Sequence, residues 1–298
     1  MTAFLFPGQG SQQPGAAHLF VNACPNARAV VERARTLLPD VVFQIMRDGP
    51  RETLNDTRNA QPALVCAEMA ASAYLAHIGI TPEICAGHSL GEISALTAAG
   101  ALSFEQALPL VGKRARLMSE NVPEGGMAAV LGLPPETIAE VLPENAQIAN
   151  YNGPAQTIIS GTKDALAEAA EGLKQAGAKR VLPLPVSGPF HSRFMSDAAD
   201  ALARYLADVD VLPPTVAFLS SVSGEYETDP ARIKLLLAEQ LVSPVRWTRV
   251  MEQLSGRQAI EVGPGAVLQG LAKRMSNAPA VRSADSPEAC DRLLLDDV

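Results

Sequence analysis

The chain has 298 residues, 47% of them hydrophobic and only 4% aromatic, so Ala, Leu and Val must supply a core large enough for one large α/β domain or two smaller ones. Its net charge of −8 and the lack of a Lys/Arg block argue against a nucleic-acid-binding protein. The four widely spaced cysteines indicate buried, reduced thiols, not disulfides or a zinc site: Cys24, Cys66, Cys85 and Cys290.

The apolar residues 2–6 predict a strand. They are not expected to belong to a signal peptide, because no basic segment precedes them and the apolar run is short. No apolar run reaches the roughly 18 residues that a membrane span requires. We therefore expect a cytoplasmic protein that binds neither a membrane nor nucleic acid. A monomer is expected as well, although the sequence does not determine the oligomeric state.

Helical patterns dominate the residues after this strand and the Gly-rich loop at 7–12. We predict short helices at 27–38 and 43–48, and a long buried helix at 61–78 in which Pro62 is the second residue, a favourable place for proline. Ser103 and Gln106 form a capping box that predicts the start of a helix running to about Asn121.

From Gly125 the pattern changes to β-α-β-β-α-β, the ferredoxin-like order. The predicted elements are strand 127–131, helix 134–141, strands 147–150 and 156–160, helix 162–176 and strand 179–184. Pro/Gly-rich segments flank this unit. We predict an α/β-hydrolase-like catalytic subdomain with a mostly parallel sheet at 1–123 and 189–298, and an inserted ferredoxin-like small subdomain at 124–188.

The remaining chain returns to mixed helices and strands. The predicted helices are 194–206, 233–241, 247–254 and 267–275, and the predicted strands are 215–220 and 258–262. Beyond Asn277 only one short strand is indicated, at 280–282.

Ser89 is the candidate nucleophile. It is the central residue of Gly-His-Ser-Leu-Gly, between a short apolar strand at 84–86 and a helix at 92–98, which is the arrangement of a nucleophile elbow. The two glycines suit a turn too tight for side chains, and the helix N-terminus offers free N–H groups to an oxyanion. The alternative is a Gly/Ser turn without function.

A serine nucleophile needs a base, and the chain has four histidines. His18 and His77 are expected at the surface, and the side chain of His88 is expected to point away from Ser89. His191 lies in a Pro/Gly-bounded loop and is the predicted base. No loop acid is evident between Ser89 and His191, so we predict a dyad oriented by a backbone carbonyl, without a triad acid.

Arg114 falls within the apolar stripe of the helix that starts at 103. The stripe consists of Ala107, Leu110, Val111, Leu117 and Met118. A buried arginine needs an anionic partner, because an unpaired buried charge is very costly. An internal salt bridge and a carboxylate-binding role in the active cleft fit this pattern equally well.

Several of these segments together resemble the malonyl-CoA:acyl-carrier-protein transacylases of fatty-acid synthesis and the acyltransferases of polyketide synthases. The matching segments are Phe-Pro-Gly-Gln-Gly-Ser-Gln at 6–12, Thr-Arg-Asn-Ala-Gln-Pro-Ala-Leu at 57–64, Ala-Gly-His-Ser-Leu-Gly-Glu at 86–92, Arg114 in Lys-Arg-Ala-Arg-Leu-Met, Ala-Asn-Tyr-Asn-Gly-Pro-Ala-Gln at 149–156, Gly-Pro-Phe-His-Ser at 188–192 and Glu-Val-Gly-Pro-Gly at 261–265.

The resemblance implies that Ser89 takes a malonyl group from malonyl-CoA and passes it to the phosphopantetheine thiol of a holo acyl carrier protein. His191 would be the base in both half-reactions, and the main-chain N–H groups of Gln9 and Leu90 would form the oxyanion hole. Arg114 would pair with the malonyl carboxylate through two N–H groups. No bound cofactor and no metal are implied.

The resemblance also suggests further residues. Phe190 before His191 resembles the Phe-His pair of malonyl-selective members. The segment 241–245 would supply the carbonyl that orients His191, with Ser243 where many members carry asparagine. Three other residues match positions near the acyl pocket: Gln61, His88 and Asn152.

The carrier protein is normally acidic, as this chain is, so docking would need a local basic patch. The candidate residues are Lys179, Arg180, Arg193, Lys273 and Arg274. Three alternatives remain open from the sequence: a thioester hydrolase with the same dyad, an acyltransferase for a different extender acyl-CoA, and a catalytically silent docking component. The sequence also leaves open whether the pathway is fatty-acid or polyketide synthesis.

Overall fold

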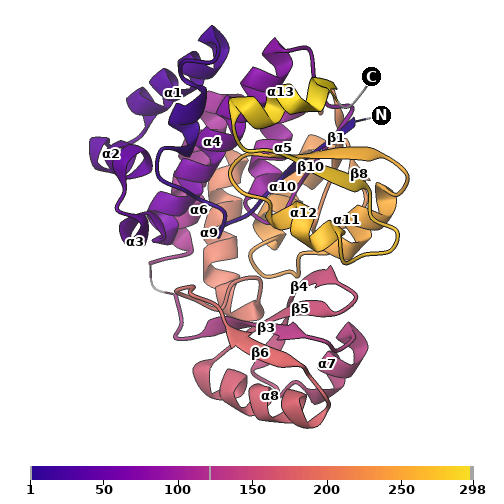
Figure 1. The fold of residues 1–298 in the computed structure, drawn as a ribbon. Helices are drawn as coiled ribbons and strands as arrows, with labels where there is room; N and C mark the ends of the chain where they lie inside the picture. Colours follow the sequence, from indigo (N-terminus) through magenta and orange to yellow (C-terminus); the bar gives the residue numbers. More distant parts are fainter. Residues whose placement is uncertain (1, 121, 296–298) are drawn as a thin grey trace.

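Two separate β-sheets organise the chain in the computed structural model, which describes residues 2–120 and 122–295 (Figure 1). The larger sheet has six strands in the order β10-β9-β1-β2-β7-β8. Its strands are β1 (Thr2–Phe6), β2 (Ile84–Gly87), β7 (Ala217–Leu219), β8 (Tyr226–Glu227), β9 (Gln258–Val262) and β10 (Ala280–Ala284). All its pairings are parallel except that of β7 with β8.

The central strand β1 is apolar and buried from Ala3 to Phe6, as expected where helices cover both faces of a parallel sheet. Phe4 and Phe6 belong to one buried cluster, whereas Ala3 and Leu5 belong to another on the opposite face. Phe6 pairs with Gly87 at the ends of β1 and β2, so the loops that follow these two strands lie side by side. Loops at the carboxyl ends of parallel strands are where α/β proteins bind ligands.

The long helix α4 (Thr57–His77) packs against α1, α6 and the short 3-10 helix η1 on one face of the large sheet, while α11 and α12 lie toward the other (Figure 1). The other helices outside the second sheet are η1 (Ala16–Phe20), α1 (Pro25–Leu37), α2 (Asp40–Asp48), α3 (Arg51–Leu54), α5 (Gly91–Ala98), α6 (Phe104–Leu117), η2 (Arg193–Met195), α9 (Ser196–Ala207), α10 (Pro230–Glu239), α11 (Trp247–Gln253), α12 (Val267–Ala272) and α13 (Pro287–Leu295).

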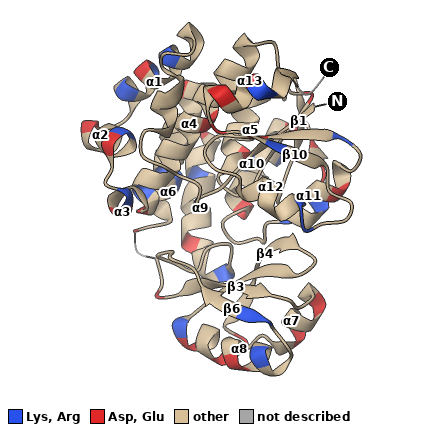
Figure 2. Cartoon of the chain, viewed as in Figure 1, with Lys and Arg blue, Asp and Glu red and all other residues tan. Residues whose placement is uncertain are grey.

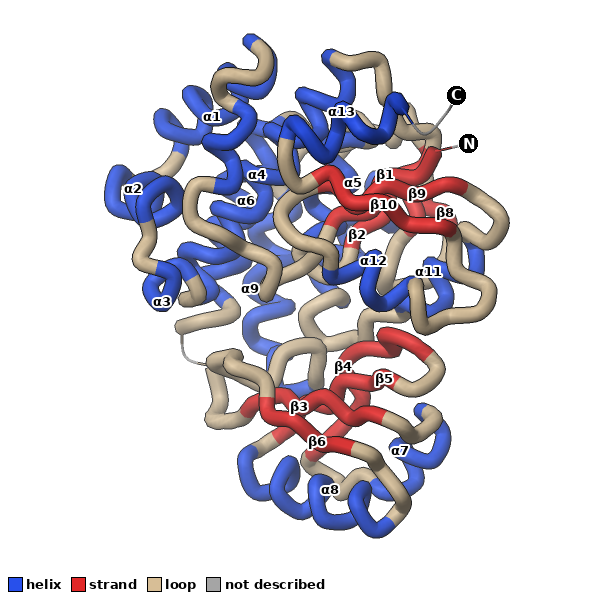
Figure 3. Tube along the Cα trace, viewed as in Figure 1, coloured by secondary structure: helices blue, strands red, loops and turns tan. Residues whose placement is uncertain are grey.

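The second sheet is antiparallel throughout and has the strand order β4-β5-β3-β6 (Figure 3). Its elements are β3 (Gly126–Leu131), α7 (Pro135–Val141), β4 (Ala146–Gly153), β5 (Gln156–Gly161), α8 (Lys163–Gln175) and β6 (Arg180–Pro183). Both helices pack on one face, over a small apolar core of their own. This β-α-β-β-α-β unit has the ferredoxin-like strand order, which confirms the predicted fold class. The subdomain boundaries at 124 and 188 stay a prediction.

Strand β4 ties the second sheet to the larger part of the chain. The main-chain N–H of Tyr151 donates to the carbonyl of Val245 at 2.9 Å, and the N–H of Val245 donates to the carbonyl of Ala149 at 2.8 Å. The intervening residue, Asn150, forms a parallel bridge with Val245. This pairing brings β4 beside the loops that end β1 and β2.

The differences from the predicted elements include two helix boundaries and one helix that was not predicted. Helix α4 starts at Thr57, because Asp56 caps it by accepting the N–H of Arg58, and Pro62 therefore lies inside the helix. Helix α6 has the predicted capping box but ends at Leu117. The predicted end at Asn121 lies outside the described residues. Helix α13, beyond the short strand near 280, was missed altogether.

The described residues include no helix that is both long enough and apolar enough to cross a membrane.

Candidate active site

Ser89 occupies a sharp turn between β2 and α5, with a backbone φ of 52° that non-glycine residues rarely adopt. A Cβ atom on Gly87 would lie 1.9 Å from the main chain of Gly91, and one on Gly91 would lie 2.1 Å from the carbonyl of Phe6. Both positions therefore need glycine, and the turn has the geometry of a nucleophile elbow.

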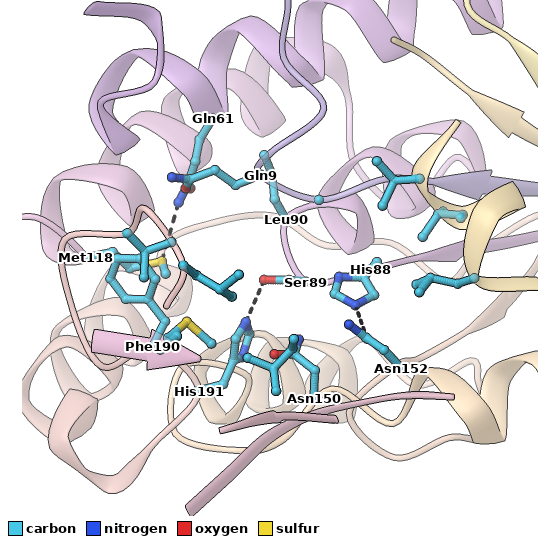
Figure 4. Close-up of a pocket in the computed structure, with 18 of the residues that line it drawn as sticks. Gln9, Gln61, His88, Ser89, Leu90, Met118, Asn150, Asn152, Phe190 and His191 are labelled. Carbon is cyan, nitrogen blue, oxygen red and sulfur yellow. Dashed lines mark hydrogen bonds between the residues drawn. The ribbon is translucent and has the colours of Figure 1, made fainter. Parts of the chain in front are cut away.

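His191 meets Ser89 from a loop 102 residues further along the chain (Figure 4). Its Nε2 lies 2.8 Å from the hydroxyl oxygen of Ser89, and its Nδ1 lies 2.8 Å from the main-chain carbonyl of Gln240. A carbonyl only accepts, so Nδ1 carries the proton and Nε2 is free to accept the hydroxyl proton of Ser89. His191 also has a positive φ, of 56°.

The carbonyl that orients His191 was assigned to the wrong residue. We predicted Ser243, but the acceptor at hydrogen-bond distance is Gln240, three residues earlier, at the residue that follows α10. The backbone of Ser243 also raises the pKa of His191, but less than Gln240 does. A main-chain acceptor is used in either case, so the change from the family's asparagine at 243 leaves it intact.

Burial, and secondarily the positive charge of Arg114, lower the pKa of His191 to about 3. Both effects disfavour the imidazolium form. The ring is consequently neutral over the physiological pH range, which is the state that a general base requires.

Arg114 is 2% exposed, and it donates three hydrogen bonds to neutral acceptors. They are the side-chain oxygen of Gln61 at 2.9 Å, the hydroxyl of Ser89 at 3.1 Å and the side-chain oxygen of Gln240 at 2.6 Å. Its Nε atom is buried without a partner, and desolvation lowers its pKa to about 10. No described carboxylate forms an ion pair with it, so an internal salt bridge does not explain its burial.

The dyad and Arg114 line one cavity of about 190 Å³. Figure 4 shows His191 directed at Ser89, while His88 points toward Asn152. The other predicted site residues that line the cavity are Gln9, Gln61, His88, Leu90, Asn152 and Phe190. Apolar side chains supply the rest of the wall, among them Met118, Met127, Ile158, Leu184 and Val186. The locations agree with the predicted site, while the individual roles stay predictions.

The side chain of His88 points away from Ser89, which confirms the prediction from its place in the elbow. Its Nε2 lies 2.9 Å from the side-chain oxygen of Asn152 on β4, and its ring meets Trp247 edge to face. His77 is exposed as predicted, but His18 is half-buried against Phe43, which corrects its assignment to the surface.

The Gly-rich loop after β1 packs directly on the elbow. A Cβ atom on Gly8 would lie 2.8 Å from the carbonyl of His88, and the side chain of Gln9 donates to the Thr57 hydroxyl at 3.1 Å. Within the described residues, the main-chain N–H groups of Gln9 and Leu90 donate to no other group. Two free N–H donors beside a nucleophile suit a developing oxyanion.

Sequence reasoning missed two buried residues at this site, Gln240 and Glu92. Gln240 lies one residue before the segment that we had compared with the family, and Glu92 lies within the Ala-Gly-His-Ser-Leu-Gly-Glu match. A single buried polar residue just after α10 leaves no periodic signal, because it stands among buried apolar residues such as Ala238 and Leu241.

The sequence is similar to that of known proteins over nearly its whole length. The family model of the acyl transferase domain matches residues 3–286. The malonyl CoA-acyl carrier protein transacylase of Bacillus subtilis is 42% identical over 300 residues, covering 97% of this chain and 95% of the relative. That of Salmonella typhimurium is 40% identical, covering 98% of each.

Solved structures agree. The acyl-carrier-protein S-malonyltransferase of Burkholderia pseudomallei superposes with a TM-score of 0.93 at 42% identity, covering 99% of both chains. A malonyl-transacylase in complex with a type II PKS acyl-carrier protein superposes with a TM-score of 0.94 at 38% identity, covering 99% of both chains. A match of this extent to the family model and to these relatives shows that the chain belongs to the acyl transferase domain family.

Proposed function

We propose that this chain transfers a malonyl group from malonyl-CoA to the phosphopantetheine thiol of an acyl carrier protein, in fatty-acid or polyketide synthesis. The observation that carries the proposal is the contact of Ser89 with His191 beside Arg114, a buried cation that forms no ion pair with any described carboxylate. The relatives named malonyl CoA-acyl carrier protein transacylase support it.

In the first half-reaction, the hydroxyl of Ser89 attacks the thioester carbonyl of malonyl-CoA while Nε2 of His191 takes its proton. The main-chain N–H groups of Gln9 and Leu90 stabilise the tetrahedral oxyanion. The C–S bond then breaks, and the imidazolium returns the proton to the sulfur of the leaving coenzyme A. A malonyl-serine ester remains.

In the second half-reaction, His191 takes the proton of the carrier's phosphopantetheine thiol, and the sulfur attacks the ester carbonyl. When the C–O bond breaks, the proton passes from His191 to the oxygen of Ser89, and the free enzyme is restored. Because the ring begins and ends neutral, one histidine serves both steps.

Arg114 selects the acyl group in this proposal. The malonyl carboxylate would supply the missing anion and accept from the unpartnered Nε as well as from a terminal N–H, which is the two-pronged geometry that arginine favours. An acetyl group would leave the buried guanidinium unpaired, and a site built for a charged group discriminates strongly against substrates that lack it.

The remaining predicted residues shape the pocket around this pair. We assign Phe190 and Gln61 to the wall of the acyl site; Gln61 also accepts from Arg114. Asn152 and His88 hold the elbow against β4 through their hydrogen bond. The proposal includes no bound cofactor; malonyl-CoA and the carrier protein are substrates.

A basic surface next to the cavity would receive the carrier protein. Arg274 donates to Gln156, which lines the cavity, and Gln156 pairs across the small sheet with Leu131, which pairs with Arg180. Exposed Lys273, Arg274, Lys179 and Arg180 thus lie toward one end of that sheet, and Figure 2 shows the basic segment of β6. Arg193 lies toward the other end, bonded to Asn145. A cytoplasmic location and a monomeric state stay predictions.

The test is to trap the acyl-enzyme and weigh it over a panel of acyl-CoAs, then to add holo carrier protein. We expect a malonyl adduct on the parent protein, none on Ser89→Ala, and malonyl-carrier as the main product. Release of free malonate as the main product would show a hydrolase instead. An equal adduct on Ser89→Ala would exclude every mechanism that uses this serine.

A further inference from the structure

Glu92 is a second ionisable group buried at this site, and the mechanism above gives it no task. It lies on the first turn of α5, three residues after Ser89, and is 1% exposed. One of its oxygens accepts from the Ser220 hydroxyl at 2.8 Å and from the main-chain N–H of Ser221 at 2.6 Å. The other accepts from the side-chain amide of Gln240.

Gln240 in turn contacts each of the three residues that carry the proposed chemistry. Its side-chain oxygen accepts from Arg114 at 2.6 Å, and its side-chain nitrogen donates to the main-chain carbonyl of Ser89 at 3.0 Å. Its own main-chain carbonyl accepts from His191. Through hydrogen bonds Glu92 reaches these three residues by way of Gln240, and its charge also favours the charged form of Arg114 directly.

Elementary donor and acceptor rules fix the orientation of the Gln240 amide. A guanidinium only donates, so Arg114 requires the amide oxygen on its side. A backbone carbonyl only accepts, so Ser89 requires the amide nitrogen on its side. Glu92, whose pKa burial raises, accepts from the same nitrogen. All three groups agree on one orientation, and the reverse one would place the amide nitrogen against the Arg114 donor and the amide oxygen against the Ser89 carbonyl.

We propose that Glu92 is a positioning residue that fixes the Gln240 amide with its oxygen toward Arg114, and thereby holds the guanidinium ready for the carboxylate of the acyl group. Arg114 makes only neutral contacts, so the amide oxygen is one of the three acceptors that keep it in place. The inference rests on the proposed function, since it concerns acyl selectivity at the same pocket.

Glu92→Gln tests this with almost no change of shape. The N–H of Ser221 is a main-chain donor, so the oxygen of the new amide must face it, and the new NH₂ group must face the NH₂ group of Gln240. Either that conflict persists, or Gln240 turns and presents its NH₂ group to Arg114. An unmade buried hydrogen bond is worth about a tenfold change in rate or more, so we expect the malonyl-to-acetyl rate ratio to fall about tenfold.

Glu68→Gln is the matched control. Glu68 is also fully buried and also bonds to α5, through the hydroxyl of Ser94, but it contacts neither Gln240 nor Arg114. Burial raises the pKa of Glu68, as it also raises that of Glu92, so the two variants replace carboxyl groups in similarly buried surroundings. We expect this variant to keep the parent's malonyl-to-acetyl ratio.

A second variant, Gln240→Met, removes the amide but keeps the main-chain carbonyl that accepts from His191. It should lose malonyl preference to a similar degree. Because both changes act through one amide, the double variant should lose no more preference than the single variants do.

The measurement is the rate of Ser89 acylation by malonyl-CoA and by acetyl-CoA, on variants shown by thermal unfolding to be folded. A parent-like ratio in Glu92→Gln, or an equal fall of both rates, overturns the inference. If Glu92→Gln does not fold, the test passes to Gln240→Met, and a parent-like malonyl-to-acetyl ratio in that variant overturns the inference. Failure of the parent to take a malonyl group would overturn the proposed function itself, which is a separate result.

Discussion

Arg114 differs from the arginine two residues later in every property that matters for acyl selection. Arg114 is 2% exposed and has no described carboxylate partner, whereas Arg116 has a side chain 66% exposed that pairs with Glu120. Both lie on α6, so one helix offers a test residue and a matched control.

We expect Arg114→Ala to abolish the preference for malonyl-CoA over acetyl-CoA. Loss of a contact between buried charges costs about 2–5 kcal/mol, which is at least a thirtyfold loss in relative rate. Arg116→Ala should keep the parent's preference. Acylation rates with the two acyl-CoAs provide the measurement, and an unchanged ratio in Arg114→Ala would refute the assigned role.

The low pKa of His191 gives a second prediction at this scale. Because burial and Arg114 lower it to about 3, the ring stays neutral as the pH falls. Acylation should therefore keep nearly its full rate from pH 8 to pH 5, where a free imidazole of pKa about 6.5 would be mostly protonated. Loss of half the rate near pH 6.5 would contradict this.

Removing the cation should shift that profile in a known direction. Arg114 disfavours the imidazolium, so Arg114→Ala should raise the pKa of His191 and move the acid limb to higher pH. The profile is measured with acetyl-CoA, which does not need Arg114, and Arg116→Ala again serves as the control.

The sequence was informative about residues whose chemistry a pattern exposes. Ser89 stands between two glycines that the turn requires, His191 was the one histidine in a suitable loop, and Arg114 interrupted an apolar stripe. Gln240 could not be found in this way, because its key contact is made by a main-chain carbonyl, and any residue type carries one.

At the scale of single elements, the turn from β2 to α5 leaves no room for a side chain at its glycines. A Cβ atom on Gly87 would overlap the backbone of Gly91, and backbone atoms cannot move aside as flexible side chains do. The positive φ of Ser89 depends on the same turn.

We expect Gly87→Ala to be strongly destabilised or not to fold, and to lose acylation. Gly112→Ala on α6 is the control, since nothing lies within 4 Å of its new Cβ atom. Alanine in a helix interior should raise the free energy of unfolding by about 0.5–1 kcal/mol. Chemical denaturation measures both effects; a Gly87→Ala variant as stable as the parent would contradict the turn geometry.

Sequence patterns predicted the existence of most elements better than their ends. The capping box at Ser103 placed the start of α6 correctly, because both of its hydrogen bonds are local. The start of α4 was missed by four residues, because Pro62 was taken as the first-turn proline although the actual cap is Asp56.

At the scale of the whole molecule, the site exists because three distant parts of the chain meet. Parallel pairing brings the Gly-rich loop beside the elbow, and the pairing of β4 with Val245 brings Asn152 to His88. Each element was predictable from local patterns, but the isolated pairing with Val245 was not, since a bridge that short leaves no mark on the sequence.

Docking of the carrier protein is a property of this whole surface. Lys273 is exposed at the end of α12, the helix whose Val267, Leu268 and Leu271 line the cavity, and no described acidic group pairs with it. Lys174 is also exposed, but it lies on α8, which packs on the small sheet, and it pairs with Glu171. Charge reversal at each lysine changes the net charge equally. Comparing the two variants therefore distinguishes a local effect on docking from an effect of net charge.

We expect Lys273→Glu to raise the KM for holo carrier protein by about three- to tenfold, the effect of reversing one exposed charge at an interface. Because exposed charges are screened, the difference from the parent should vanish at high salt. Acylation by malonyl-CoA is measured separately, so that an effect on the first half-reaction is recognised. Lys174→Glu should keep the parent's KM; equal increases in both variants would mean that net charge, and not this surface, governs the encounter.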